Sequence, residues 1–338
     1  MTTSREICLA RRPNGAPSLD DFTLRTVEVA APSAGAFLVR NRYMSVDPYM
    51  RLPMTGQDGV HAAMDAGHTL TGAAIGVVEQ SAHDGWPVGA WVVSGIHGWR
   101  EAYLSDGAGL TRLDALAGEP SLYVGLLGLI GVTAFAGIEG VLMPGPSDSL
   151  FVSGAAGAVG SVACQLAKRR GARVLGTTGS DIKVAWLKDE LGLDEAVNYK
   201  TAGDLREVIK DFAPDGLNMM FDNVGGETLE ATLDVMKPGG HLALCGAIAL
   251  YNGANYRAGP ANFFTVIEKC LRVEGFNAGP YYPRAGEIFA FLGGLLANGE
   301  LVWRETVREG IEAAPGAFID MMAGANIGKM LVSLQPQS

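Results

Sequence analysis

Residues 149–178 read SLFVSGAAGAVGSVACQLAKRRGARVLGTT, and their pattern of apolar and small residues indicates the fold class. An apolar run over 149–153 predicts a buried strand, and the small residues after it predict a tight turn. Apolar positions over 159–170 recur at helical spacing, Gly171 ends the predicted helix, and 173–178 is a second apolar strand. This order of strand, helix and strand is the unit from which parallel sheets are built.

The same alternation continues downstream of this stretch. Four further strands, with helices between them, are predicted at 196–199, 217–223, 241–245 and 271–276. Six strands connected in this way predict a doubly wound parallel sheet, and hence an α/β protein.

The remainder of the chain predicts a second, β-rich domain. Clusters of Pro, Gly, Asn and Asp separate short predicted strands at 6–10, 23–29, 36–44, 72–79 and 90–94. A last predicted strand at 330–334 indicates that the chain returns to this domain. We expect a β-rich domain over residues 1–122, completed by 301–338, and a nucleotide-binding domain over 123–300.

Glycines mark the turn between the first strand of the parallel sheet and its helix. Gly154, Gly157 and Gly160 are spaced three apart, and small residues fill most of the positions between them. A pyrophosphate at a helix N-terminus needs backbone N–H groups at close range, which larger side chains would block. The place of this turn, after a strand and before a helix, predicts a dinucleotide site. A glycine-rich turn without a ligand is the alternative.

The end of the second strand separates NAD from NADP. An NAD site usually has an acidic residue there, about 20 positions after the glycine turn, for the ribose hydroxyls. Here the strand ends at Thr177 and Thr178, and Asp181 stands where a helix N-cap is expected. Lys183 follows in the first turn of that helix, where a cation can bind a 2′-phosphate. These residues favour NADP, although Lys183 alone is also compatible with a solvated helix position.

Composition excludes several classes of protein. The chain has 338 residues and a net charge of −10, so we expect no nucleic-acid partner. Its four cysteines, Cys8, Cys164, Cys245 and Cys270, form no C-x-x-C pair, which is typical of free thiols in the cytoplasm. The first residues lack the apolar run of a signal peptide, and the uncharged stretch 122–138 is shorter than the about 20 residues of a membrane span. We therefore expect a cytoplasmic protein without a membrane partner.

Eight motifs occur in order along nearly the whole chain: VDPYMR (46–51), AAGAVGSVACQLAK (155–168), GSDIK (179–183), NYK (198–200), FDNVGG (221–226), CGAIALYN (245–252), RVEGF (272–276) and NIGK (326–329). Together they resemble the zinc-independent medium-chain dehydrogenase/reductases. Within these, they are similar to the branch of leukotriene B4 dehydrogenase/prostaglandin reductase and curcumin reductase. The resemblance implies a GroES-like β-rich domain, a Rossmann domain and a homodimer. It also implies NADPH-dependent reduction of the carbon–carbon double bond of α,β-unsaturated ketones and aldehydes.

The same resemblance implies the residues of the site. The cofactor pyrophosphate would be held by Gly157, Ala158, Val159 and Gly160, and the 2′-phosphate end by Lys183 and Tyr199. The rest of NADP(H) would be lined by Asn223, Cys245, Gly246, Ala247, Tyr251, Phe276, Asn277, Ala278 and Asn326. Tyr49 and Tyr251 are the candidate catalytic residues, and Tyr49 is expected to face the substrate carbonyl.

A catalytic zinc, which other medium-chain dehydrogenases use, needs about three protein ligands. Gly67 and His68 match the start of their G-H-E segment, but Thr69 stands in place of the acid. No second histidine lies at a helical ligand spacing. We therefore expect His68 to be a loop or pocket residue and the protein to bind no metal.

Two questions stay open at this point. Many relatives carry a tyrosine near the substrate, eight residues before Phe276, where this chain has Glu268. That carboxylate either makes the pocket more acidic or is a solvated helix residue. The reaction is expected to be enone or enal reduction. Quinone reduction on the same two domains and a non-catalytic NADPH-binding protein are the alternatives.

Overall fold

The computed structural model describes residues 1–57, 62–253 and 259–334. The chain divides into two compact units. One unit consists of Met1–Gly125 with Glu305–Ser338, and the other of Leu126–Arg304. The second unit is therefore inserted into the first, and each is described by itself below.

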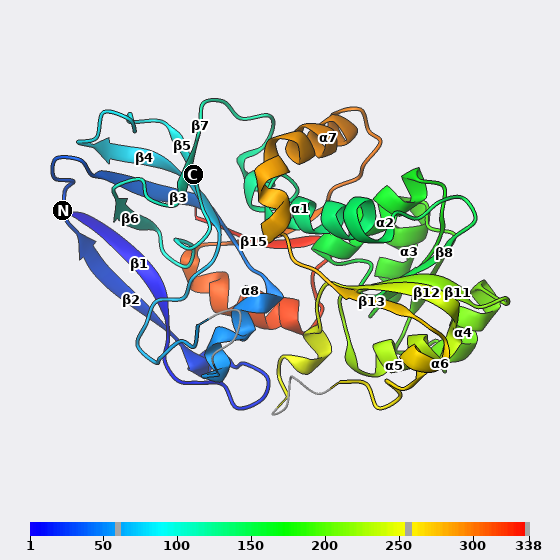
Figure 1. Ribbon diagram of the computed structural model, residues 1–338. Coiled ribbons are helices and arrows are strands. Elements are labelled where there is room, and N and C mark those ends of the chain that lie inside the picture. Colours follow the sequence, from blue (N-terminus) through cyan, green and yellow to red (C-terminus); the bar gives the residue numbers. More distant parts are fainter. Residues whose placement is uncertain (58–61, 254–258, 335–338) are drawn as a thin grey trace. The chain divides into compact units, whose positions relative to one another are not determined.

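The inserted unit is built on a six-stranded parallel sheet (Figure 1). Its strands are β8 (Ser149–Val152), β9 (Arg173–Thr178), β10 (Glu195–Asn198), β11 (Leu217–Asp222), β12 (Met236–Leu244) and β13 (Arg272–Gly275). They lie in the order β10-β9-β8-β11-β12-β13. The direction of winding changes between β8 and β11, and ligands of such sheets bind at that point, beyond the carboxyl ends of the strands. The predicted doubly wound sheet is confirmed.

Helices cover both faces of this sheet (Figure 1). They are α1 (Leu129–Phe135), α2 (Ala158–Arg169), α3 (Asp181–Asp189), α4 (Leu205–Phe212), α5 (Gly226–Val235), α6 (Thr265–Glu268) and α7 (Ala285–Ala297). Apolar side chains of α4 and α5 pack into one core with those of β8, β9, β11 and β12. On the other face, α1 packs against both α2 and α7. A π-helix, η5 (Ala136–Leu142), continues α1, and two 3-10 helices, η6 (Ile248–Leu250) and η7 (Gly279–Arg284), complete the unit.

The other unit is β-rich, as expected. Its larger sheet has the order β14-β15-β3-β4-β5-β7, with β6 paired to β3. These strands are β3 (Phe37–Ser45), β4 (Ala74–Ser81), β5 (Trp91–Ser94), β6 (Ala102–Ser105), β7 (Leu110–Leu113), β14 (Glu305–Glu309) and β15 (Lys329–Ser333). Because β14 and β15 come from the end of the chain, this sheet is completed only by residues that follow the inserted unit.

The core of the β-rich unit lies where both parts of the chain meet. A separate hairpin of β1 (Thr2–Leu9) and β2 (Phe22–Val29) joins it, and α8 (Ala314–Met322) packs on it. Aromatic rings of Phe22, Trp99 and Phe318 meet there with centroids 6.1–6.3 Å apart. The short turns of this unit are η1 (Leu19–Asp21), η2 (Pro48–Arg51), η3 (Pro53–Thr55), η4 (Pro120–Val124) and η8 (Ile311–Ala313). Among the described residues, the helices are all too short or too polar to cross a membrane.

Candidate cofactor and substrate sites

The glycine turn between β8 and α2 is shaped by close contacts of the backbone. Gly154 has a φ of +61°, which favours glycine, and the N–H of Ala155 donates to the carbonyl of Thr177 at 2.9 Å. A Cβ on Gly160 would lie 2.4 Å from the carbonyl oxygen of Gly154, so only glycine fits there. The N-cap Gly157 provides no side-chain cap. The first N–H groups of α2, at 158–160, are thus oriented for an anion.

Two lysines meet beside the carboxyl ends of β9 and β10. Lys183, in the first turn of α3, is only 7% exposed. Burial, and then the nearby charge of Lys200, hold the pKa of Lys183 below its ordinary value. A bound anion would relieve both effects, since it favours the charged form of the ammonium. A phosphate group at this corner would therefore stabilise the charged Lys183 better than water does.

The surroundings of these lysines belong to the same corner. Tyr199 is 56% exposed, and a Cβ on Gly179 would lie 3.3 Å from its hydroxyl oxygen. Asp181 accepts a hydrogen bond from the Asn198 amide at 2.8 Å, so its carboxylate is engaged at the start of α3. Our sequence reasoning missed Lys200. The signal was present in the NYK motif at 198–200, where only the tyrosine was selected.

A buried carboxylate organises the strand ends at the switch point. Asp222 is 1% exposed and accepts from the Ser153 hydroxyl at 2.6 Å and from the N–H of Gly225 at 3.1 Å. Burial raises the pKa of Asp222. Asn223 donates its side-chain amide to the carbonyl of Ser153 at 2.7 Å, so the ends of β8 and β11 are tied together. Sequence reasoning selected Asn223 but not Ser153 or Asp222, which lie behind it.

The residues after β12 fold back over the same edge of the sheet. The N–H groups of Cys245 and Gly246 both donate to the carbonyl of Asp222, at 2.8 and 3.1 Å. Burial raises the pKa of the Cys245 thiol to about 12, which favours the neutral thiol over the thiolate. The hydroxyl of Tyr251 accepts from the N–H of Ala247 at 3.3 Å. Burial also raises the pKa of Tyr251, so its phenol keeps a proton that it can donate.

The predicted residues after β13 lie at this edge too. The ring of Phe276 packs edge-on against Phe221, with centroids 5.8 Å apart. Asn277 is exposed, and its side-chain oxygen accepts from the N–H of Gly279 at 2.9 Å. Ala278 is buried. The parallel sheet thus brings all the predicted residues of the inserted unit to the carboxyl ends of its strands, whereas Tyr49 and Asn326 belong to the β-rich unit.

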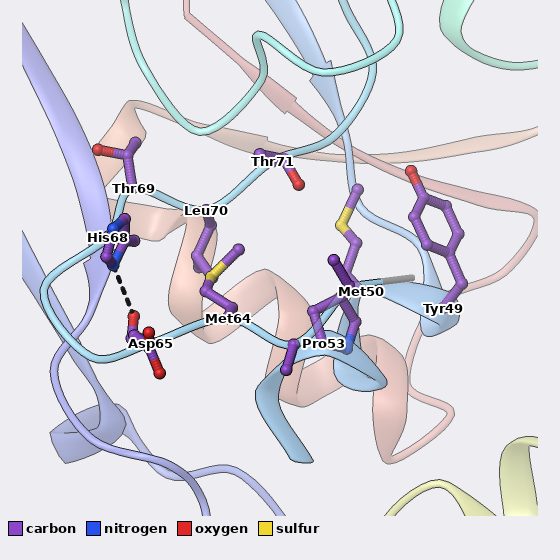
Figure 2. A pocket seen from close by; sticks show the side chains of 11 residues that line it. Tyr49, Met50, Pro53, Met64, Asp65, His68, Thr69, Leu70 and Thr71 are labelled. Carbon is purple, nitrogen blue, oxygen red and sulfur yellow. Dashed lines mark hydrogen bonds between the residues drawn. The ribbon is translucent and has the colours of Figure 1, made fainter. Parts of the chain in front are cut away.

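Tyr49 lines a pocket of about 490 Å³ in the β-rich unit. Figure 2 shows Tyr49 at one end of it and His68, Thr69 and Asp65 at the other. Between these ends the wall is formed by the apolar side chains of Met50, Pro53, Met64 and Leu70, and by Thr71. A pocket of this size that combines apolar walls with polar groups is typical of a small-molecule site.

Asn326 lies in a tight turn near the end of the chain. It is 9% exposed, and its side-chain amide donates to the carbonyl of Gly328 at 2.7 Å. Glu268, by contrast, is exposed at the end of α6. The two residues belong to different units.

Comparisons with known proteins identify the family. A family described as the N-terminal domain of oxidoreductase matches residues 5–113, and one described as zinc-binding dehydrogenase matches 158–290. A putative NADP-dependent oxidoreductase of Bacillus subtilis is 37% identical over 100% of both chains. The NADP-dependent 2-alkenal reductase of Nicotiana tabacum is 35% identical over 98% of this chain and 97% of its own. The crystal structure of CurA from Vibrio vulnificus with NADPH is 34% identical, covers 98% and 100%, and has a TM-score of 0.92.

The chain belongs to the medium-chain dehydrogenase/reductases. It lies in their zinc-independent branch, with the prostaglandin, 2-alkenal and curcumin reductases. This medium-chain reductase is an NADP-dependent oxidoreductase, as its named relatives are, and it binds NADP(H). The predicted family, enzyme class and cofactor are thereby confirmed.

The name of the second matching family raises the question of zinc in this medium-chain reductase. Throughout the described part of the chain, no three His, Cys, Asp or Glu side chains are grouped so that they could hold a metal ion. His68 lines the pocket, and its Nδ1 lies 3.3 Å from the carbonyl oxygen of Asp65. That the enzyme binds no metal stays a prediction, which metal analysis of the purified protein would test.

Proposed function

We propose that this enzyme reduces the carbon–carbon double bond of α,β-unsaturated ketones and aldehydes with NADPH. The observation that carries the proposal is the position of Tyr49, a half-buried phenol at one end of a pocket large enough for a small molecule. The names of the relatives point to the same reaction. We also propose that the domain over 123–300 binds the cofactor, and that the domain over 1–122 with 301–338 carries Tyr49.

Bound NADPH supplies a hydride for the β-carbon of the substrate. Negative charge then develops on the carbonyl oxygen, and a phenol that donates a hydrogen bond stabilises this enolate more than the neutral carbonyl. We assign that donor role to Tyr49. A proton from solvent then adds to the α-carbon, so that one hydride and one proton convert the enone into the saturated ketone.

Tyr251 is the second candidate donor. It lies in the inserted unit, at the strand ends that gather the other cofactor residues. The N–H of Ala247 orients its oxygen, and the raised pKa keeps its proton in place at neutral pH. We propose that it donates toward the nicotinamide end of the site, where a fixed and neutral hydroxyl adds polarity without charge.

The remaining roles follow from the strand ends of the parallel sheet. We propose that the N–H groups of 158–160 bind the pyrophosphate and that Lys183, Tyr199 and Lys200 bind the 2′-phosphate. Asn223, the 245–247 segment, the 276–278 segment and Asn326 would then line the nicotinamide half. Because the ring of Phe276 is packed against Phe221, its backbone rather than its ring would meet the cofactor.

Isotope transfer tests the reaction. NADPH that carries deuterium at the transferred position should place one deuterium on the β-carbon of an enone, and the reaction in D₂O should place one on the α-carbon. Deuterium on the carbonyl carbon would mean ketone reduction instead. Turnover of quinones without turnover of enones or enals would replace the proposal by quinone reduction, and no turnover with any of them would favour a non-catalytic protein.

A single substitution tests the donor. Tyr49→Phe removes the hydroxyl and should lower kcat for enone reduction by about 100-fold, as loss of one oxyanion donor does in other enzymes. The dissociation constant for NADPH should stay within a factor of about two. Tyr123→Phe is a matched control, because Tyr123 lies with Tyr49 in the compact unit that includes Met1–Gly125, and its hydroxyl accepts from the N–H of Ala117 at 2.7 Å. An unchanged kcat in Tyr49→Phe would transfer the donor role to Tyr251.

The state of assembly and the place in the cell are separate proposals. A homodimer is expected from the family resemblance, and β13 ends the six-stranded sheet on one side, where a second copy can pair. Light scattering of the purified enzyme tests this, and a monomer at micromolar concentration would contradict it. A cytoplasmic location stays a prediction from the cysteine pattern.

A further inference from the structure

The residues around Tyr49 in the turn 46–51 are anchored by buried side chains. Met50 is 4% exposed, and its sulfur accepts from the N–H of Asp47 and from the indole N–H of Trp99, both at 3.4 Å. A Cβ on Gly72 would lie 2.4 Å from the Met50 methyl, so glycine leaves the space that this methyl fills. Arg51 is buried as well and donates to the carbonyl of Gly15 at 2.9 Å. The backbone on the C-terminal side of Tyr49 is therefore held by its neighbours.

The N-terminal side of the same turn is held by a lysine from the other end of the chain. Lys329 is 1% exposed, and its Nζ lies 2.9 Å from Oδ1 of Asp47. It also donates to the carbonyl oxygens of Val46 at 2.7 Å and Met330 at 3.0 Å. The second oxygen of Asp47 accepts from the Ser45 hydroxyl. An ammonium has three N–H donors, and all three are used.

Stability alone does not explain why the Lys329–Asp47 ion pair is buried. Burial of an ion pair commonly contributes no more than well-packed apolar residues of the same volume would. Burial does hold the pKa of Lys329 below its ordinary value. What the pair supplies instead is one fixed geometry, because a buried charge with three partners has few alternative positions.

The pair also joins two candidate site segments that are far apart in the sequence. Lys329 begins β15, which is antiparallel to β3, with Leu331 opposite Ser45. Tyr49 lies just beyond β3, and Asn326 lies three residues before Lys329. The ammonium therefore ties the turn that carries Tyr49 to the start of β15, three residues after Asn326.

We propose that Lys329, acting through Asp47, is a positioning residue that holds the Tyr49 phenol in a single orientation in the pocket. The inference rests on the proposed function, in which Tyr49 is the donor to the substrate carbonyl. Lys329 itself would not touch substrate. Lys329 would contribute to kcat, because a hydrogen-bond donor displaced by about 1 Å loses much of its effect on a developing charge.

The kinetic test removes the pair without leaving a buried charge behind. Asp47→Asn with Lys329→Met neutralises both partners, and kcat for an enone should fall tenfold to a hundredfold, on the order expected for a misplaced catalytic group. Added to Tyr49→Phe, the same pair of changes should lower kcat by no more than about twofold further, because both act through one hydroxyl. Losses that multiply, or a kcat like that of the wild type, would overturn the proposal.

A control pair separates positioning from a general effect of lost ion pairs. Lys168 and Asp194 form an ion pair with Nζ 2.8 Å from Oδ2, in the inserted unit and apart from the proposed site. Lys168→Met with Asp194→Asn should leave kcat within about twofold of the wild type. A loss as large as that of the Asp47 and Lys329 pair would show that the effect is not specific to Tyr49.

A spectroscopic test decides the proposal even if no enone is reduced. With 3-fluorotyrosine incorporated at Tyr49, the ¹⁹F NMR spectrum should show one narrow line in the parent protein. The Asp47→Asn, Lys329→Met variant should show a shifted line that is broadened or split. If that variant does not fold, Ser45→Ala, which removes one hydroxyl contact, should broaden the line to a smaller extent. An unchanged line in the folded variant would overturn the positioning role, whereas inactivity of the wild type would overturn only the proposed function.

Discussion

The two units of this enzyme build their candidate sites by opposite means. In the inserted unit, the residues come from successive strand ends, and parallel topology alone carries them to one edge of the sheet. In the β-rich unit, the Tyr49 turn and the Asn326 loop are 277 positions apart in the numbering (326 minus 49) and meet through the Lys329–Asp47 ion pair. The first site is made largely of backbone, and the second depends on a few side chains with long-range partners.

Because of this difference, the two sites are sensitive to different substitutions. A backbone site fails when a side chain intrudes or when the charge that recognises the ligand is lost. A site held by a long-range pair fails when one partner is removed and the other is left buried and unpaired. Substitutions in the two sites should therefore have effects of different size and kind.

The largest effect is expected from Lys329→Met alone. It leaves the Asp47 carboxylate buried without its partner, which should lower the free energy of unfolding by about 3–5 kcal/mol. Asp47→Asn combined with Lys329→Met should recover most of that loss. Urea unfolding of both variants measures this. Equal free energies of unfolding for the single and the combined variant would mean that Lys329 and Asp47 do not stabilise each other's charge.

Lys183→Ala should weaken NADPH binding and leave NADH binding almost unchanged. A hydrogen bond to a charged group is worth about 1.5–3 kcal/mol, which is roughly tenfold to a hundredfold in the dissociation constant. Lys188→Ala is the matched control, because Lys188 lies on the same helix α3 and pairs only with the exposed Glu195 among the contacts resolved there. Fluorescence titration with NADPH and with NADH measures the two dissociation constants. Equal losses for NADPH and NADH would give Lys183 another role.

Gly160→Ala tests the backbone site directly. The new Cβ would lie 2.4 Å from the carbonyl oxygen of Gly154, and overpacking of this kind costs about 1–3 kcal/mol. We expect lower stability together with weaker binding of both NADPH and NADH. Gly294→Ala, in α7 with no atom within 4 Å of its Cβ, should be neutral or slightly stabilising. Unchanged cofactor binding in Gly160→Ala would separate this turn from the cofactor.

The smallest effect is a pH dependence of cofactor choice. In the enzyme without cofactor, Lys183 has a pKa below its ordinary 10.5. The 2′-phosphate favours its charged form, so NADPH binding takes up a proton once this lysine begins to titrate. The dissociation constant for NADPH should therefore rise as the pH is raised into the alkaline range below 10.5, and that for NADH should not. Parallel slopes for the two cofactors would contradict this.

Sequence reasoning found some of these residues for identifiable reasons. Gly154, Gly157 and Gly160 repeat at a fixed spacing after an apolar strand, and Lys183 follows at the end of the next strand, so local pattern was sufficient. Lys200 was missed although it stands in the NYK motif, because its place beside Lys183 depends on the pairing of β10 with β9. Ser153 and Asp222 were missed because they only support Asn223, and no local sequence pattern predicts a supporting hydrogen bond.

Hydrophobic period and turn chemistry are local properties of the chain, so they were sufficient to predict the doubly wound sheet, the β-rich remainder and the glycine turn. The motifs also identified the family and the cofactor. The buried groups that support the site, by contrast, depend on the tertiary fold. Lys329 lies 282 positions from Asp47, and a contact across such a distance exists only once β15 has paired with β3 and excluded water from both charges.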